Sequence, residues 1–151
     1  MKSQFSKKGV TLIELVIVMV IIAIGAVLIT PGIGTWMINY RLRGATHDIV
    51  SMLRTAQMKA VSTNLEYQVS FANQSFLLQK GNLSSGSTTW TDEGVAQTLP
   101  AGITMSGSLN NSNAQFNVNS TCSTGSLTLT SSKGSKKITL TTSTGRIKVE
   151  Q

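Results

Sequence analysis

Near the N-terminus, the residues Gly9, Val10 and Glu14 have types and a spacing suited to chemistry. The run Lys7-Lys8-Gly9-Val10 is followed four residues later by Glu14, the single charged residue of the apolar stretch 10–29. A carboxylate at membrane depth costs about 2.5–3.5 kcal/mol, so it is usually paired and functional. If the chain were cut after Gly9, a new α-amine would appear at Val10, one helical turn from Glu14. We therefore expect this amine and this acid to pair, within one chain or between neighbours, and to pack helices together in lipid.

A second group of residues lies near the C-terminus, where apolar and polar residues alternate. This period of two predicts a three-stranded antiparallel meander with one apolar face, which turns the intervening basic side chains outward. An exposed basic patch is the electrostatic footprint of a polyanion binder. The plainer interpretation is a solvated sheet face, or an edge that lysines protect against aggregation. The candidate patch consists of Lys133, Lys137, Arg146 and Lys148.

The remaining reactive residues do not make a catalytic or metal site. The chain has one histidine, His47, and one cysteine, Cys122, and neither has a second ligand at a metal-binding spacing. A nucleophile–base triad cannot be built around a lone histidine, and a lone cysteine cannot form an internal disulfide. The adjacent acids Asp92 and Glu93 are typical of a loop. We expect no enzymatic activity, no cofactor and no metal.

The apolar stretch that carries Glu14 has the length of a membrane span. Twenty residues at a 1.5 Å rise match the ~30 Å hydrocarbon core. Three lysines precede the stretch, and the next basic residue is Arg41, which predicts a cytoplasmic N-terminus and an exported remainder. The apolar region of a cleaved secretory signal is shorter than this stretch and ends at a small-x-small cleavage site, so a secretory signal is not the favoured interpretation. A plain single-span anchor would account for the length and the lysines but not for Glu14.

The residues after the span predict an α+β domain. Pro31 should bend the helix, which continues to about residue 63 with one apolar face. From residue 65 the period changes to two, so that Glu66 and Gln68 would alternate with inward-facing residues of a half-buried strand. Further short strands and Ser/Asn/Gly-rich loops follow. The expected apolar stripe of the helix consists of Ile38, Leu42, Ala45, Ile49, Leu53, Ala56 and Ala60.

The N-terminal run resembles the class III signal of the type IV pilin superfamily. The resemblance covers about thirty residues and implies that a prepilin peptidase cuts after Gly9 and N-methylates Val10. Glu14 matches the family's glutamate at the fifth mature position, and Pro31 matches the proline that kinks the helix. Val10 departs from the phenylalanine that most members carry.

This resemblance implies a long N-terminal helix, half membrane-spanning and half amphipathic, packed on a C-terminal antiparallel β-sheet domain. The expected segments are a cleaved leader (1–9), a transmembrane and assembly helix (10–30), an amphipathic helix (31–63) and a β-rich domain (64–151). The expected location is the bacterial inner membrane, with the N-terminus cytoplasmic, the domain periplasmic and the assembled chain in a pilus or pseudopilus.

The C-terminal pattern around Gly145-Arg146-Ile147-Lys148 resembles the GspH/FimT group of pseudopilins and minor pilins. Three functions follow as expectations. The first is a minor pilin or pseudopilin that acts in filament initiation or at the tip, with other pilins as partners. The second is a DNA-binding minor pilin for uptake, since some FimT-type members bind DNA through a Gly-Arg-x-Arg pattern. Here lysine replaces the last arginine, which keeps the charge but loses bidentate geometry. The third is a major pilin.

Overall fold

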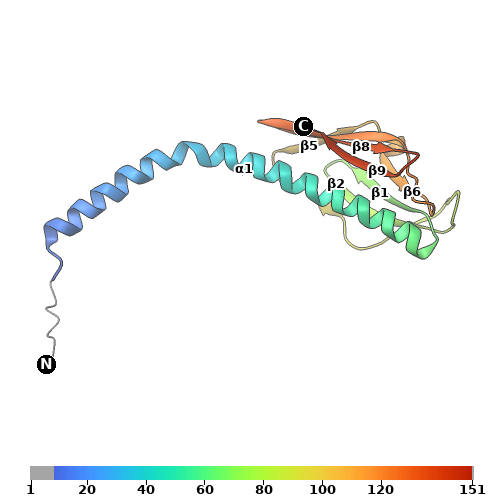
Figure 1. Cartoon of the computed structure of the whole chain (residues 1–151), viewed down its shortest axis with the longest axis horizontal. Helices are drawn as coiled ribbons and strands as arrows, with labels where there is room; N and C mark the ends of the chain where they lie inside the picture. The colour runs from blue at the N-terminus through green and yellow to red at the C-terminus, as the bar shows by residue number, and fades with distance from the viewer. Residues whose placement is uncertain (1–8, 151) are drawn as a thin grey trace, which may run out of the picture. The chain divides into compact units, whose positions relative to one another are not determined.

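The computed structural model describes residues 9–150, except the side chains of 27–33. The helix α1 (Leu12–Thr63) precedes a series of short strands (Figure 1). The chain divides into two compact units, Met1–Trp36 and Met37–Gln151, and each is described by itself. The strands are β1 (Tyr67–Ala72), β2 (Ser75–Gly81), β3 (Trp90–Asp92), β4 (Gln97–Thr98), β5 (Ile103–Gly107), β6 (Asn113–Phe116), β7 (Gly125–Ser131), β8 (Gly134–Thr141) and β9 (Arg146–Glu150), with a 3-10 turn, η1 (Asn110–Ser112), before β6.

The described part of the first unit is helical from Leu12 onward, and its described large apolar side chains are exposed. Val10 is 73% and Leu12 is 83% exposed, and the large apolar residues up to Ile24 are exposed as well. In the described part of the chain, no helical stretch combines the length and the apolar character that are needed to span a bilayer. The expected leader residues 1–8 and the side chain of Pro31 lie outside the described part of the chain.

The second unit contains the core, and the helix contributes the predicted apolar stripe to it. Leu42, Ala45, Ile49, Leu53, Ala56 and Ala60 are buried, whereas Ile38, at the start of the stripe, is half-buried. Residues three and four apart share one face of a helix, so this stripe seals the core from one side. The prediction of an amphipathic helix packed on the globular domain is confirmed.

Two antiparallel sheets complete the core. The first has the order β3-β2-β1-β6, with β4 pairing to β2, and the second has the order β5-β7-β8-β9. The inward-facing residues of both sheets belong to the same buried cluster as the helix stripe. The α+β class is therefore confirmed, and so is the predicted C-terminal meander, which is formed by β7, β8 and β9.

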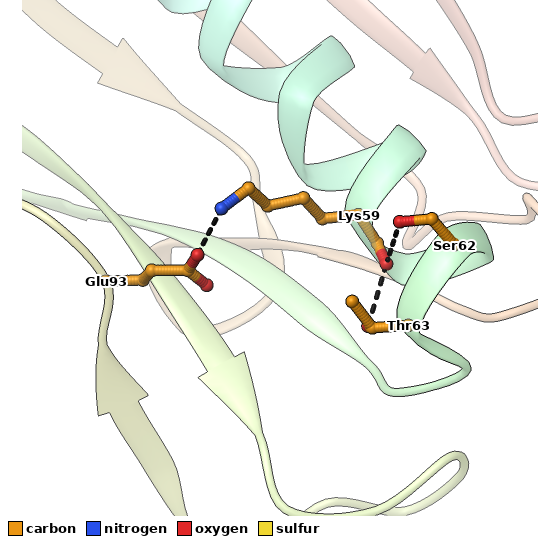
Figure 2. Close-up of polar contacts among 4 residues, drawn as sticks. All are labelled: Lys59, Ser62, Thr63 and Glu93. Carbon is orange, nitrogen blue, oxygen red and sulfur yellow. Dashed lines mark hydrogen bonds and ion pairs between the residues drawn. The ribbon is translucent and has the colours of Figure 1, made fainter.

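An ion pair joins the last turns of α1 to the segment after β3. Lys59 Nζ pairs with Glu93 Oε1, and within the helix the hydroxyls of Ser62 and Thr63 donate to the Lys59 carbonyl oxygen at 3.2 and 2.8 Å (Figure 2). The side-chain hydrogen bond from Lys59 lowers the pKa of Glu93. Glu93 is thus a contact between the helix and the segment after β3, rather than a member of an acidic loop pair with Asp92.

The structure differs from the predicted alternation at Glu66 and Gln68. Both were expected on the solvent side of a strand, yet they are only 3% and 5% exposed. The segment between β2 and β3 folds back over this position, where the Glu66 carboxylate accepts the N–H groups of Gly86 at 3.0 Å and Ser87 at 2.7 Å. A buried carboxylate is tolerated because it is hydrogen-bonded.

The hydrogen bonds of Glu66 predict an acid-sensitive element of stability. Burial raises the pKa of Glu66, but the hydrogen bonds from Ser87 and Gly86 outweigh it and hold the pKa below its ordinary value of 4.5. A depressed pKa contributes stability that is present above the ordinary value and is lost as the pH falls through the folded-state value. We expect Glu66→Gln to lower the free energy of unfolding at pH 7 by about 1–3 kcal/mol and to flatten its decline below about pH 4.5.

Chemical denaturation of both proteins between pH 3 and 7 measures this effect. Glu150→Gln is the matched control, because Glu150 forms only an exposed ion pair, which contributes little to stability. An unchanged pH profile in Glu66→Gln would show that the buried contacts of Glu66 do not govern acid stability.

Candidate functional site

The candidate site is the outward face of the β7-β8-β9 meander. Lys137 on β8 lies opposite Thr128 on β7 and Glu150 on β9. On β9, Arg146 and Lys148 lie opposite two β8 threonines. All three basic residues are exposed, whereas the intervening β8 residues, Ile138 and Leu140, are buried. Strand alternation therefore gathers Lys137, Arg146 and Lys148 on one solvent-facing surface.

The other two lysines of the meander lie in different surroundings. Lys133 is exposed in the β7–β8 turn, where its N–H donates to Ser131 Oγ at 3.3 Å. Lys136 points to the opposite side of β8 and lines a groove of about 240 Å³ with Arg43 and His47 of α1. The basic face is hereafter the set Lys133, Lys137, Arg146 and Lys148, and Lys136 does not belong to it.

An acidic residue lies within the basic face. Lys148 Nζ is 2.7 Å from Glu150 Oε1, and Glu150 is also the cross-strand partner of Lys137. The hydrogen bond from Lys148, together with the positive charges of Lys148 and Lys137, lowers the pKa of Glu150. Four basic residues and one acidic residue leave three excess positive charges on this surface. The residues between them are threonines and serines, so the face offers charge and hydroxyl groups but no aromatic platform for bases.

One side chain of α1 holds the turn from which β9 starts. Gln57 Nε2 donates to the carbonyl oxygens of Gly145 at 3.1 Å and Ser120 at 3.2 Å, and to Ser120 Oγ at 2.9 Å. Gly145 has φ +58°, and a Cβ atom there would lie 1.9 Å from the Ser120 carbonyl oxygen. Glycine is therefore needed at position 145 for both its left-handed conformation and its small size. Because Arg146 is the next residue, the position of Gly145 determines where β9 begins. The role of Gln57 was not predicted from the sequence, because no pattern in the neighbouring residues indicates a contact with residues 63 and 88 positions away.

At the N-terminal candidate site, the structure adds a capping residue. Thr11 precedes the first residue of α1, and the Glu14 N–H donates to Thr11 Oγ1 at 3.3 Å and to the Thr11 carbonyl at 3.1 Å. Thr11 and Glu14 have the spacing of a capping box, a signal that was present in the sequence. In the uncut chain the Val10 nitrogen belongs to a peptide bond, and nothing lies within 4 Å of a Cβ built on Gly9. Gly9 and Val10 are both exposed in the described part of the chain.

The remaining candidates are separate from both sites. Cys122 is 1% exposed, and this burial raises the pKa of its thiol, whose Sγ donates to the Thr141 carbonyl at 3.4 Å. Within residues 9–150, no three His, Cys, Asp or Glu side chains are close enough together to hold a metal ion. His47 borders the groove beside Lys136.

The contacts of Gly145 lead to a stability prediction. We expect Gly145→Ala to lower the free energy of unfolding by about 2 kcal/mol or more, because the methyl group collides with the Ser120 backbone and the residue keeps a left-handed conformation. Gly134→Ala is the control, since nothing lies within 4 Å of its Cβ position. Denaturant titration of both variants measures the difference. Equal stability of the two variants would contradict the tight contact at the start of β9.

Comparisons with known proteins agree with this description. Residues 5–30 match the family described as the prokaryotic N-terminal methylation motif, whereas a search of curated sequences finds no significant match. The minor pseudopilin EpsH of the Vibrio cholerae type 2 secretion system aligns with a TM-score of 0.59 at 10% identity, over 73% of this chain and 96% of that chain. The type IV minor pilin FimU of Pseudomonas aeruginosa aligns with a TM-score of 0.59 at 15% identity, over 75% of this chain and 90% of that chain. The chain therefore carries a prokaryotic N-terminal methylation motif at residues 5–30 and has the fold of these two solved structures.

Proposed function

We propose that the chain is a non-enzymatic structural subunit, a minor pilin or pseudopilin, of a type IV pilus or a type II secretion pseudopilus. The observation that carries the proposal is the methylation motif at residues 5–30 on a chain with a pilin-like domain. A prepilin peptidase would cut after the accessible Gly9 and methylate Val10. The two solved structures compared above are of minor subunits, which favours a role in initiation or at the tip over that of a major pilin.

The exposed apolar helix supports assembly in a membrane and a filament. From Val10 to Ile24, large apolar side chains are exposed on every side of the helix. Burying one such side chain is worth about 1.5–3 kcal/mol, so the whole segment strongly favours lipid or neighbouring helices over water. The chain would insert into the inner membrane with its N-terminus cytoplasmic and its domain periplasmic, and then pack against other subunits.

Two roles for Glu14 can be separated within this proposal. The Glu14 N–H is capped by Thr11 Oγ1, and the Glu14 side chain has the spacing to complete the capping box, with a charge that suits the positive end of the helix dipole. As an assembly residue, its carboxylate pairs with the methylated amine that cleavage creates at Val10. Cleavage removes the residues before Val10 and leaves Thr11 in place, so both interactions can exist in the mature chain.

We expect Glu14→Ala and Glu14→Gln to reduce incorporation into the filament about tenfold or more, since both remove the charge that pairs with the amine. The measurement is the amount of each variant in sheared or crosslinked filaments, relative to its level in the membrane. Thr11→Ala is the matched control, because it removes the cap and keeps the acid. Mass spectrometry of the mature N-terminus shows whether each variant is still cut and methylated.

The outcomes distinguish the two roles of Glu14. Loss of incorporation in correctly processed Glu14→Gln, with normal incorporation of Thr11→Ala, supports charge pairing. Normal incorporation of Glu14→Ala contradicts an assembly role for this residue. Losses in Thr11→Ala and Glu14→Ala, with normal incorporation of Glu14→Gln, would assign the effect to the helix cap, because glutamine can also complete a capping box.

The basic face favours a second candidate function, the binding of DNA during uptake. Lys137, Arg146 and Lys148 share one exposed surface, with Lys133 in the adjoining turn. A sheet face with three excess positive charges and no aromatic side chain can contact phosphates but cannot stack bases. Binding would therefore be independent of sequence and sensitive to salt, and Glu150 would weaken it.

We expect the full chain to bind duplex DNA at low salt, and the double variant Arg146→Ala/Lys148→Ala to bind at least about tenfold more weakly with a smaller salt dependence. Fluorescence anisotropy at several salt concentrations measures both quantities. Arg54→Ala/Lys80→Ala is the control, because it removes the same charge away from the basic face. Glu150→Gln should strengthen binding. Equal affinities of the two double variants would exclude this face as the DNA site.

A further inference from the structure

The outward face of the β3-β2-β1-β6 sheet carries a small polar pocket that the roles above do not use. Its volume is about 160 Å³. Asparagine and glutamine amides, serine hydroxyls and one indole, that of Trp90, line it, and no charged side chain belongs to the lining that the structure describes. Gln68 and Gln115 form its floor as neighbours on β1 and β6.

A row of hydrogen bonds across the sheet sets the orientation of the floor. Gln68 Nε2 donates to Gln79 Oε1 at 2.7 Å, and Gln79 Nε2 donates to Asp92 Oδ1 at 2.8 Å. An ionised carboxylate can only accept, so Asp92 turns the nitrogen of Gln79 toward itself and the oxygen of Gln79 toward Gln68. Gln68 in turn directs its amide nitrogen toward Gln79 on β2, so its carbonyl oxygen is the remaining acceptor of this amide.

The wall of the pocket is held in place by buried contacts. The N–H of Ser87 donates a hydrogen bond to the carboxylate of Glu66, which is almost fully buried, and this bond holds Ser87 in place. On the other side, the Gln115 N–H donates to Ser123 Oγ at 3.1 Å. Trp90 is half-buried and pairs with Gly81, at which a Cβ atom would lie only 2.4 Å from Ser87 Oγ. The polar groups are thus positioned before any ligand arrives, which lowers the entropic cost of binding.

We propose that this pocket binds a neutral sugar unit of a glycan. Neutral amides and hydroxyls supply both donors and acceptors, which suits the adjacent hydroxyl groups of a sugar. The indole of Trp90 adds an apolar surface for the C–H face of the ring. The lining has no lysine or arginine to neutralise a phosphate or carboxylate, so the pocket selects against anionic ligands. This role does not depend on the assembly role proposed above.

The test uses the full chain in a non-glycosidic detergent, because the head group of a maltoside detergent would itself occupy a sugar site. Saturation-transfer NMR and calorimetry are recorded with glucose, galactose, mannose and N-acetylglucosamine. We expect saturable binding of at least one of these sugars, with glucose 6-phosphate binding more weakly than glucose if glucose is bound. Trp90→Ala and Asn113→Asp should each weaken binding about tenfold or more. Trp36→Ala is the matched control, because Trp36 does not line the pocket.

Each outcome decides the proposal. Binding that is lost in Trp90→Ala or Asn113→Asp and kept in Trp36→Ala supports it, provided that circular dichroism shows a folded variant. If Trp90→Ala fails to fold, Asn113→Asp alone decides. The proposal is overturned if none of the four sugars gives saturable binding up to ~100 mM, or if the folded pocket variants bind as the parent does. Stronger binding of glucose 6-phosphate than of glucose also overturns it.

Discussion

The globular unit depends on the burial of one face of α1 in a core that both sheets share. Ile49 and Leu53 are almost completely buried, and truncating either residue would cost about 2–5 kcal/mol. The small residues Ala45, Ala56 and Ala60 on the same face let the strands approach the helix closely. Burial of this stripe fixes both the rotation of the helix about its axis and its position along that axis.

Fixing the rotation of the helix also places its polar residues. Gln57 and Lys59 flank the stripe at its C-terminal end, so each points toward a different sheet. Gln57 holds the turn before β9, and Lys59 pairs with Glu93 after β3. The orientation of Arg146 on the basic face therefore depends on apolar packing in the interior, through Gln57 and the glycine that it contacts.

Residues whose side of an element follows from periodicity could be predicted from the sequence. The stripe from Leu42 to Ala60 and the outward positions of Lys137, Arg146 and Lys148 follow directly from periods of 3.6 and 2. Burial of Glu66 could not be predicted, because it depends on a loop that returns from twenty residues further along the chain. The alternation of residues within one strand does not indicate which segment from elsewhere in the chain will cover that strand.

The same distinction applies to the candidate sites. The Gly145 turn was predictable from its composition, but its contact with Ser120 and Gln57 joins three distant segments and has no local signal. The capping role of Thr11 could have been predicted from its spacing to Glu14. It was not predicted, because an acid in an apolar segment first indicates a pairing role in the membrane. The amide row on the first sheet requires the strand register, which sequence patterns alone do not provide.

The two sheets share one core but present different chemistry to solvent. The outward face of the β7-β8-β9 meander offers charge and hydroxyl groups, which suit a polyanion, whereas the outward face of the first sheet offers neutral amides around Trp90. Glu14 lies in a helical segment whose described large apolar side chains, up to Ile24, are exposed, and the buried core cluster consists of residues of the second unit. Substitutions on one outward face should therefore change the chemistry of that face and leave the other face unchanged, because each face belongs to a different sheet.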